Sequence, residues 1–304
     1  MSERSGDGSG VLASFSDGLA DAVGRAGDSV VRVEGRRRQA ASGVAWQPDG
    51  LVITADHVLE REEDLSVGLP DGRSVGAKIV GRDPGTDLAL LRLEVQGLRP
   101  IERGRSPRVG HLALVVARPG PSLATSIGVV SALGGPARSW RGGRLDGFIL
   151  TDATFYPGFS GGPLVDAAGQ MVGLATSHFG QGTGLAIPLE TVERISSALL
   201  SHGSVKRAFL GLSSQPVELP DALRTSLGGQ ESGLLVVGVE PNGPAERGGL
   251  MLGDLLVTLG GRPIRHTEDL RALLGPEQVG QATSARIIRG GEVRDLNVTI
   301  GERE

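Results

Sequence analysis

Ser160 lies in the segment Pro157–Leu164, PGFSGGPL, where glycines leave the backbone free to approach a substrate carbonyl. A serine hydroxyl attacks a carbonyl only when a base takes its proton and N–H groups stabilise the oxyanion that forms. The backbone N–H groups of Gly158 and Ser160 could supply that oxyanion hole. The alternative is a tight glycine turn with no chemical role, so the interpretation depends on partners elsewhere in the chain.

A candidate base and a candidate acid lie upstream of this serine. His57 follows one apolar segment, and Asp87 directly precedes another. The chain order His, Asp, Ser is that of the double-barrel serine proteases and differs from the orders of subtilisins and α/β-hydrolases. In such a triad His57 acts as general base and then as general acid, Asp87 fixes its tautomer, and Ser160 attacks. Asp56 is a less suitable acid, because neighbouring residues usually point apart.

Together these motifs identify a family resemblance, to the HtrA (DegP-like) serine proteases, from about residue 28 to the C-terminus. The matching strings are TADHV at 54–58, DPGTDLAL at 83–90, GVVS at 128–131, TDA at 151–153, GFSGGPL at 158–164 and GLAIP at 184–188. The resemblance implies a trypsin-like protease domain followed by a PDZ domain. It also implies cleavage of unfolded or misfolded polypeptide without ATP, and we expect no cofactor.

Three residues near the site depart from the family pattern. Phe159 and Tyr156 stand where the family usually has asparagines, and Ala55 stands two residues before His57. In zymogen-type relatives an aspartate before the serine pairs with a newly cut N-terminus, and Phe159 cannot form that ion pair. We therefore expect packing of Phe159 and Tyr156 to hold the oxyanion loop without proteolytic activation. Two alternatives stay open: a catalytically weak protease, or an inactive protease-fold scaffold or sensor that binds peptides.

The specificity pocket should be formed by the stretch just before Ser160 and by the strand after residue 173. We predict that its lining consists of Thr154, Phe155, Thr176, Ser177 and His178. A preference for Lys or Arg would require an acidic side chain at Thr154, so small or medium apolar residues are expected before the scissile bond. His178 could rim the pocket and favour an acidic residue, although a surface histidine is the commoner outcome.

The segment Phe209-Leu210-Gly211-Leu212 resembles the carboxylate-binding loop of a PDZ domain. In such a loop backbone N–H groups bind the C-terminal carboxylate of a peptide, and the strand that follows pairs with the peptide. The helix expected at 266–274 would wall the groove, with Leu270 in its specificity pocket. The alternative is a small α+β domain that only packs on the protease.

The composition favours many short strands. Glycine accounts for 49 of the 304 residues and aromatic residues for only 3%, and glycine weakens helix interiors. Turn strings such as PDG at 48–50 and 70–72 separate apolar segments, as hairpins require. Together with the resemblance, this predicts a mainly β fold: a trypsin-like double antiparallel β-barrel at 28–203, then a small α+β PDZ domain at 207–302.

Several classes of partner are disfavoured. The net charge of −4 argues against nucleic acid, and no apolar run approaches the roughly 20 residues of a membrane helix. The chain has no cysteine, which excludes disulfides and thiolate metal sites. His111, His202 and His266 show no metal-binding pattern, so no metal is expected.

The N-terminal region, 1–27, is expected to hold a disordered lead and one amphipathic helix. Its first ten residues lack the basic start and apolar middle of a signal peptide, so the cytoplasm is the expected default location. If the chain is truncated, a periplasmic or other extracytoplasmic location is expected instead. Apolar residues at 12, 15, 19 and 23 predict a helix at 12–25 that covers the barrel. The alternative is an oligomer contact, since family members often form homotrimers through N-terminal segments.

Arg36, Arg37 and Arg38 form a basic run that could be mistaken for a phosphate or heparin site. Three arginines in a short hairpin are more often a solvated tip, which is the interpretation we favour. Relatives carry a long regulatory loop at this position and this chain does not. Regulation through loop-swapped cages is therefore not expected.

Overall fold

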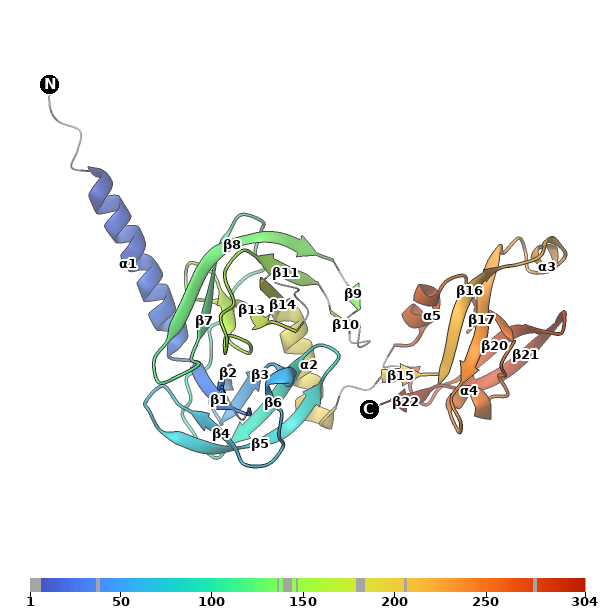
Figure 1. Ribbon diagram of the computed structural model, residues 1–304, viewed down its shortest axis with the longest axis horizontal. Helices are drawn as coiled ribbons and strands as arrows, with labels where there is room; N and C mark the ends of the chain where they lie inside the picture. Colours follow the sequence, from blue (N-terminus) through green and yellow to red (C-terminus); the bar gives the residue numbers. More distant parts are fainter. Residues whose placement is uncertain are drawn as a thin grey trace, which may run out of the picture. The chain divides into compact units, whose positions relative to one another are not determined.

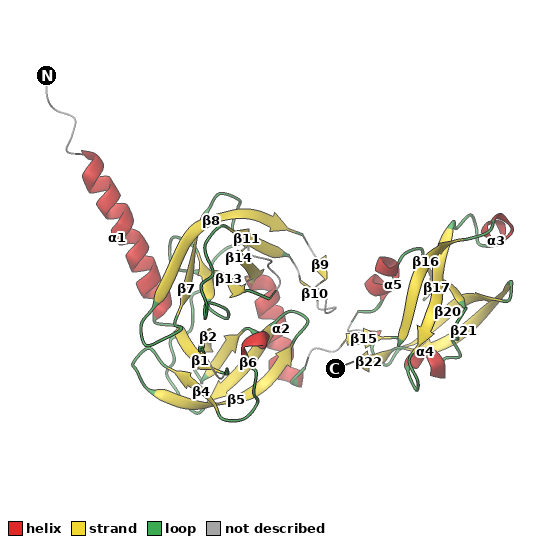
Figure 2. Ribbon diagram, viewed as in Figure 1, coloured by secondary structure: helices red, strands yellow, loops and turns green. Residues whose placement is uncertain are grey.

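The computed structural model describes residues 7–36, 39–135, 137–138, 144–145, 147–178, 184–204, 207–275 and 278–303. Contacts divide the chain into two compact units, Met1–Ser204 and Val205–Glu304, and each is described by itself. Strands dominate both units (Figures 1 and 2), which confirms the predicted mainly β fold.

Six antiparallel strands close the first barrel of the N-terminal unit in the order β1-β2-β3-β6-β5-β4. These strands are β1 (Val30–Glu34), β2 (Ala41–Gln47), β3 (Leu51–Thr54), β4 (Leu65–Gly68), β5 (Ser74–Asp83) and β6 (Leu88–Leu93). Strands β3 and β6 pair with Thr54 opposite Ala89. This register brings His57, just after β3, next to Asp87, just before β6.

A second closed barrel has the order β11-β14-β13-β12-β7-β8. Its strands are β7 (Leu112–Ala117), β8 (Ala124–Gly134), β11 (Phe148–Thr151), β12 (Pro163–Val165), β13 (Met171–Thr176) and β14 (Gly184–Pro188), with a separate pair β9 (Ala137–Arg138) and β10 (Arg144–Leu145). The loop between β11 and β12 carries Ser160. Two backbone hydrogen bonds, from Gly161 N to Ala175 O at 2.9 Å and from Ala175 N to Gly162 O at 2.8 Å, fasten this loop to β13.

Two longer helices belong to the N-terminal unit. Helix α2 (Leu189–His202) buries one face, and it packs on β5, β6 and β13. Helix α1 (Asp7–Gly27) extends beyond the predicted 12–25 at both ends. Only its C-terminal end covers the barrel, where Ala22 and Ala26 are buried.

The buried Arg118 guanidinium fixes the end of α1 to the barrels. It donates hydrogen bonds to the carbonyl oxygens of Gly27 at 3.1 Å, Val30 at 2.8 Å and Pro121 at 3.0 Å. Burial lowers the pKa of Arg118, because desolvation disfavours its charged form. Three carbonyl acceptors offset part of that desolvation cost. The cation therefore connects the end of α1 to β1 and to the loop after β7.

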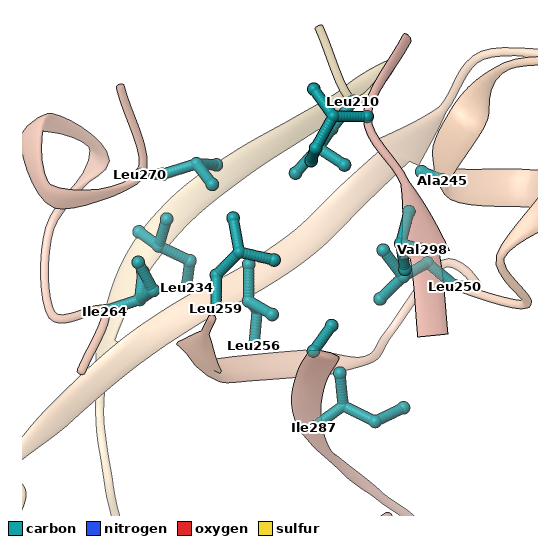
Figure 3. Packing of buried hydrophobic residues seen from close by; sticks show 12 residues of the cluster. Leu210, Leu234, Ala245, Leu250, Leu256, Leu259, Ile264, Leu270, Ile287 and Val298 are labelled. Carbon is teal, nitrogen blue, oxygen red and sulfur yellow. The ribbon is translucent and has the colours of Figure 1, made fainter. Parts of the chain in front are cut away.

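The C-terminal unit is a small sheet with short helices. Its main sheet has the order β16-β17-β18-β20-β21, and a two-stranded sheet pairs β15 with β22. The elements are β15 (Arg207–Phe209), β16 (Leu212–Glu218), α3 (Asp221–Ser226), β17 (Ser232–Val239), α4 (Pro244–Arg247), β18 (Leu255–Leu259), β19 (Arg262–Pro263), α5 (Thr267–Leu273), β20 (Ala282–Arg289), β21 (Glu292–Thr299) and β22 (Gly301–Arg303). Figure 3 shows its core, in which aliphatic side chains such as Leu210, Leu234 and Val298 pack together. Strand β16 is an edge strand, so one side of its backbone can pair with another chain.

Within the described ranges, no helix has the length and apolar character needed to cross a membrane. The same residues contain no group of three or more His, Cys, Asp or Glu side chains that could hold a metal ion.

Candidate active site

His57 and Asp87 form a close pair in the first barrel. The Nδ1 atom of His57 lies 2.7 Å from Oδ2 and 2.9 Å from Oδ1 of Asp87. The backbone N–H of His57, in the short helix η1 (Asp56–Val58), also donates to Oδ1 at 2.9 Å. Asp87 is only 1% exposed and has φ of +58°, a left-handed conformation that aspartate tolerates better than most residues. The carboxylate is therefore placed to fix the orientation of the imidazole.

Thr176 supplies a further bond to the same carboxylate. Its hydroxyl donates to Oδ2 of Asp87 at 2.5 Å, and the side chain is fully buried. The sequence predicts Thr176 as a lining residue of the specificity pocket, whereas the structure directs its hydroxyl to Asp87. Since Thr176 ends β13 of the second barrel, this bond also ties the two barrels together.

The hydroxyl of Ser160 contacts Ser177. The two Oγ atoms are 3.0 Å apart, and the backbone N–H of Ser177 donates to Oγ of Ser160 at 3.3 Å. Oγ of Ser177 in turn lies 3.4 Å from Nε2 of His57. Among the described residues, Ser160 reaches the base through Ser177 and makes no direct hydrogen bond to His57.

The turn before Ser160 fixes the direction of one backbone N–H group. The N–H of Phe159 donates to the carbonyl of Tyr156 at 3.0 Å, and Gly158 has φ of +87°. Proline followed by glycine at the centre of such a turn is typical of type II. The central peptide of this turn joins Pro157 to Gly158, and it is flipped between type I and type II turns. The type II conformation therefore sets the direction of the Gly158 N–H group. Within the described part of the chain, the N–H groups of Gly158 and Ser160 have no protein acceptor.

Ser42 of the first barrel supports this turn. Its hydroxyl donates to the carbonyl of Gly158 at 2.8 Å, and its backbone N–H donates to the carbonyl of Ser160 at 3.1 Å. A side chain at position 158 would meet Ala40 O at 2.8 Å and a Pro119 carbon at 2.6 Å. Only glycine fits there, because the space and the positive φ both exclude a Cβ atom.

Phe159 and Tyr156 contact each other beside the turn. Their rings form an edge-to-face pair with centroids 5.4 Å apart. Phe159 is 2% exposed and belongs to the core of the second barrel, whereas Tyr156 is 54% exposed. The contact expected from the sequence is present, but the anchoring is unequal, since Phe159 carries most of the burial.

The remaining residues of the expected pocket differ in their environments. Thr154 is exposed, and Phe155 is partly buried against the core of the second barrel. The ring of His178 stacks on that of His57, with centroids 5.5 Å apart and planes inclined by 20°. His178 therefore lies against the candidate base as well as near the expected pocket.

Asp56, the neighbouring carboxylate, has a different partner. Its Oδ1 accepts a hydrogen bond from Nε of Arg82 at 2.6 Å, and the side chain is buried. Asp56 thus forms an ion pair with Arg82 within the first barrel. Asp87 is the carboxylate that contacts the His57 ring.

The expected carboxylate-binding loop of the C-terminal unit follows β15. Gly211 has φ of +75°, and the carbonyls of Leu210 and Gly211 accept hydrogen bonds from Ala245 N at 2.7 Å and Glu240 N at 2.8 Å. These bonds direct the loop's carbonyls into the domain. Leu212 begins the edge strand β16 and Phe209 ends β15. Leu270 of α5 is 5% exposed and packs in the same core as Leu210 (Figure 3), so it is largely a core residue.

Comparison with known families agrees with this geometry. A trypsin-like peptidase domain matches residues 41–174, and a PDZ domain matches residues 208–300. The protein is therefore a trypsin-like peptidase fold joined to a PDZ domain.

Individual relatives narrow this class. A probable periplasmic serine endoprotease DegP-like from Ectopseudomonas mendocina (strain ymp) is 36% identical over 279 residues, which are 88% of this chain and 58% of the relative. A Marinomonas sp. (strain MWYL1) protein of the same name is 34% identical over 279 residues, 89% of this chain and 58% of the relative. The chain thus spans somewhat over half the length of these curated relatives.

Solved structures match nearly the whole length of this chain. The HtrA-type protease AlgW with decapeptide has 31% identity and a TM-score of 0.75, over 94% of this chain and 99% of that one. The serine endoprotease from Yersinia pestis has 28% identity and a TM-score of 0.77, over 94% and 98%. The chain belongs to the HtrA family of proteases, as its sequence motifs predict.

The predicted cytoplasmic location is wrong. The curated relatives are named periplasmic endoproteases. The prediction used the absence of a signal peptide from the first residues, and that absence carries no information on the compartment.

Proposed function

We propose that this protein is a serine endopeptidase in which Ser160 is the nucleophile, His57 the general base and acid, and Asp87 the residue that orients His57. The observation that carries this proposal is the paired Asp87 and His57, 2.7 Å apart, together with a nearby serine whose turn holds two N–H groups that have no acceptor among the described residues. Catalytic hydrogen bonds often tighten only when substrate binds. A rotation of the Ser160 side chain away from Ser177 would allow its hydroxyl to reach His57.

The chemistry follows from these positions. Nε2 of His57 removes the hydroxyl proton of Ser160 as Oγ attacks the substrate carbonyl, and the carbonyl π electrons move to oxygen. The N–H groups of Gly158 and Ser160 stabilise that oxyanion. The imidazolium then gives its proton to the leaving amine as the C–N bond breaks. In the second half of the reaction His57 takes a proton from water as the water attacks the acyl-enzyme. It returns that proton to Oγ of Ser160 as the ester bond breaks.

Labelling with a fluorophosphonate tests this assignment. The full-length protein should form a covalent adduct on Ser160, and Ser160→Ala should abolish both labelling and cleavage of an unfolded casein. Ser131→Ala, a serine on β8 away from the site, is the matched control and should behave as wild type. A folded wild-type protein that takes no label would overturn the enzyme and support an inactive peptide-binding scaffold.

The substrates we propose are exposed segments of unfolded or misfolded polypeptide, cut after small or medium apolar residues. The exposed Thr154 and partly buried Phe155 support an uncharged acyl-side pocket. A proteome-derived peptide library would measure this preference. A cleavage profile dominated by Lys and Arg would contradict it.

We further propose that the PDZ domain binds the C-terminal tails of peptides. The support is the edge position of β16 in its sheet and the loop at Phe209–Leu212, in which the carbonyls of Leu210 and Gly211 are bonded within the domain. Fluorescence polarisation with the full-length Ser160→Ala protein should show binding of tails with a free carboxylate. Equal binding of the same tails with amidated C-termini would contradict carboxylate recognition.

We propose a homotrimer as the assembly, as the family resemblance implies, and the exposed part of α1 supports a contact between copies. Val11, Leu12 and Phe15 are 64%, 70% and 52% exposed, and such apolar side chains on one helix favour a contact with other copies. Mass photometry should give three copies of the chain, and Phe15→Glu should shift the distribution to monomer. A monomeric wild type at micromolar concentration would exclude this assembly.

A further inference from the structure

A polar cavity of about 470 Å³ lies in the first barrel on the side of Gly158. Its walls come from strand β1, from Arg36, Gln39 and Ala40 between β1 and β2, from the segment after η1 and from the loop after β7. The lining residues are Arg32, Glu34, Arg36, Gln39, Ala40, Arg61 and Pro119. Arg37 and Arg38, the rest of the basic run, lie outside the described residues.

Two residues that line the cavity lie next to Gly158 of the candidate oxyanion hole. Ala40 and Pro119 are the two residues that a Cβ at Gly158 would meet, at 2.8 Å and 2.6 Å. Arg36 donates through Nη2 to the backbone carbonyl of His57 at 3.2 Å. One wall of the cavity therefore touches the oxyanion glycine, and another touches the backbone of the base.

The charge of the cavity is mainly positive. Three arginines face one internal carboxylate, Glu34, which is already engaged by Arg32 and by the Ser66 hydroxyl at 2.9 Å. Arg61 donates through Nη2 to the backbone carbonyl of Glu34 at 2.9 Å.

Two guanidinium nitrogen atoms beside this cavity are shielded from solvent. The Nε atoms of Arg32 and Arg36 are buried and lack a hydrogen-bond partner within the described residues, although Nε of Arg36 lies 3.6 Å from a Glu60 carboxylate oxygen. A planar guanidinium matches a carboxylate, and three arginines line this cavity beside a single lining carboxylate. The cavity is therefore suited to an anionic group such as a carboxylate.

We propose that this cavity is the subsite for a carboxylate in the half of the substrate that leaves, within the first few residues after the scissile bond. The inference rests on the proposed function. The acyl half is assigned to second-barrel residues such as Thr154 and Phe155. First-barrel residues that border Gly158 are left for the departing half. The carboxylate is supplied by an Asp or Glu side chain or by the C-terminus of a short leaving peptide.

Quenched fluorescent peptides test the subsite. A series shares one acyl half and carries Glu, Gln or Lys at the second and third positions after the scissile bond, with each product identified by mass spectrometry. We expect kcat/KM to be roughly three- to ten-fold higher for Glu than for Gln, and lowest for Lys, because charge-assisted bonds at a partly exposed site give moderate selectivity. Peptides that end at the third position, free or amidated, distinguish a side-chain carboxylate from a terminal one.

Variants of the lining separate the subsite from the general surface charge. Arg32→Gln with Arg61→Gln should bring the ratio of kcat/KM for the Glu peptide to kcat/KM for the Gln peptide, both measured on the same variant, close to one. Glu34→Gln removes the internal carboxylate and should raise the ratio. Arg73→Gln, an exposed arginine of the same barrel that pairs with Asp71, is the matched control and should change nothing.

Fluorophosphonate labelling of every variant keeps the two proposals distinct. Normal labelling with equal cleavage of the Glu and Gln peptides would overturn the subsite and leave the endopeptidase standing. A preference for Lys, or a Glu preference that survives in the double variant, would also overturn it. Loss of labelling in the folded wild type would instead overturn the proposed function.

Discussion

The proposed acid–base half of the site, His57 with Asp87, and the proposed nucleophile half, Ser160, are held by different numbers of contacts. Asp87 receives bonds from the His57 ring, from the His57 backbone and from Thr176, at distances of 2.5 to 2.9 Å. Ser160 Oγ has only Ser177 as its partner among the described residues, at 3.0 Å and 3.3 Å. The first half therefore has more hydrogen bonds to hold its geometry than the second.

The difference follows from where each half sits. His57 and Asp87 adjoin two paired strands of one barrel, so the sheet register determines their separation. Ser160 lies on a loop whose shape depends on both barrels, through Ser42 on one side and β13 on the other. Preorganised electrostatic groups are usually the largest single contribution to catalysis. We therefore expect substitutions that disturb the His57–Asp87 pair to lower the rate more than substitutions around the Ser160 hydroxyl.

Among variants that keep the Ser160 nucleophile, Asp87→Asn should produce the largest loss. The amide can hold the imidazole in place but favours the wrong tautomer, and such a change lowers kcat by about 10⁴-fold in this type of relay. Steady-state cleavage of a peptide measures the effect. Asp56→Asn is the control, because it neutralises an adjacent carboxylate that serves Arg82. Comparable losses in the two variants would show that Asp87 has no special relation to the base.

Thr176→Val should give the next largest effect. It removes the donor to Oδ2 of Asp87 without changing the shape much, and a hydrogen bond to a charged group corresponds to roughly ten- to a hundred-fold in rate. Thr176→Ser, which keeps the hydroxyl, should restore activity. Failure of that rescue would assign Thr176 a packing role only.

The sequence predicts the triad residues and the presence of two successive barrels, because both predictions depend on local patterns. Apolar strands with glycine turns indicate barrels, and the flanking strings place His57, Asp87 and Ser160 at loop ends. The roles of Thr176 and Ser177 depend on which way two consecutive residues point at the end of β13. Strand alternation shows that they point apart, but only the assembled barrels show that one meets Asp87 and the other Ser160.

The basic cavity illustrates the same limit. The arginine run at 36–38 is visible in the sequence, where it suggests a solvated tip. The other two arginines of the cavity, Arg32 and Arg61, stand 29 positions apart in the chain and converge only when β1 closes the barrel against β4. No local pattern joins them, so the cavity is a property of the barrel.

Ser177→Ala tests whether the nucleophile half is held back in the free protein. If the Ser177 hydroxyl keeps Ser160 turned from His57, its removal should raise the rate of fluorophosphonate labelling about three- to ten-fold, the range of one neutral hydrogen bond. Ser131→Ala serves again as control. Slower labelling of Ser177→Ala would contradict this expectation. It would indicate that Ser177 passes the proton from Ser160 to His57 and so assists the nucleophile.

Tyr156→Ala should have the smallest effect and sharpens the account of the oxyanion loop. The edge-to-face contact with Phe159 corresponds to about two- to three-fold at most for such an exposed ring. Labelling should therefore slow only slightly, whereas Phe159→Ala, which empties a buried position of the second-barrel core, should slow it far more. Equal losses in the two variants would show that the exposed tyrosine anchors the loop as strongly as the buried phenylalanine.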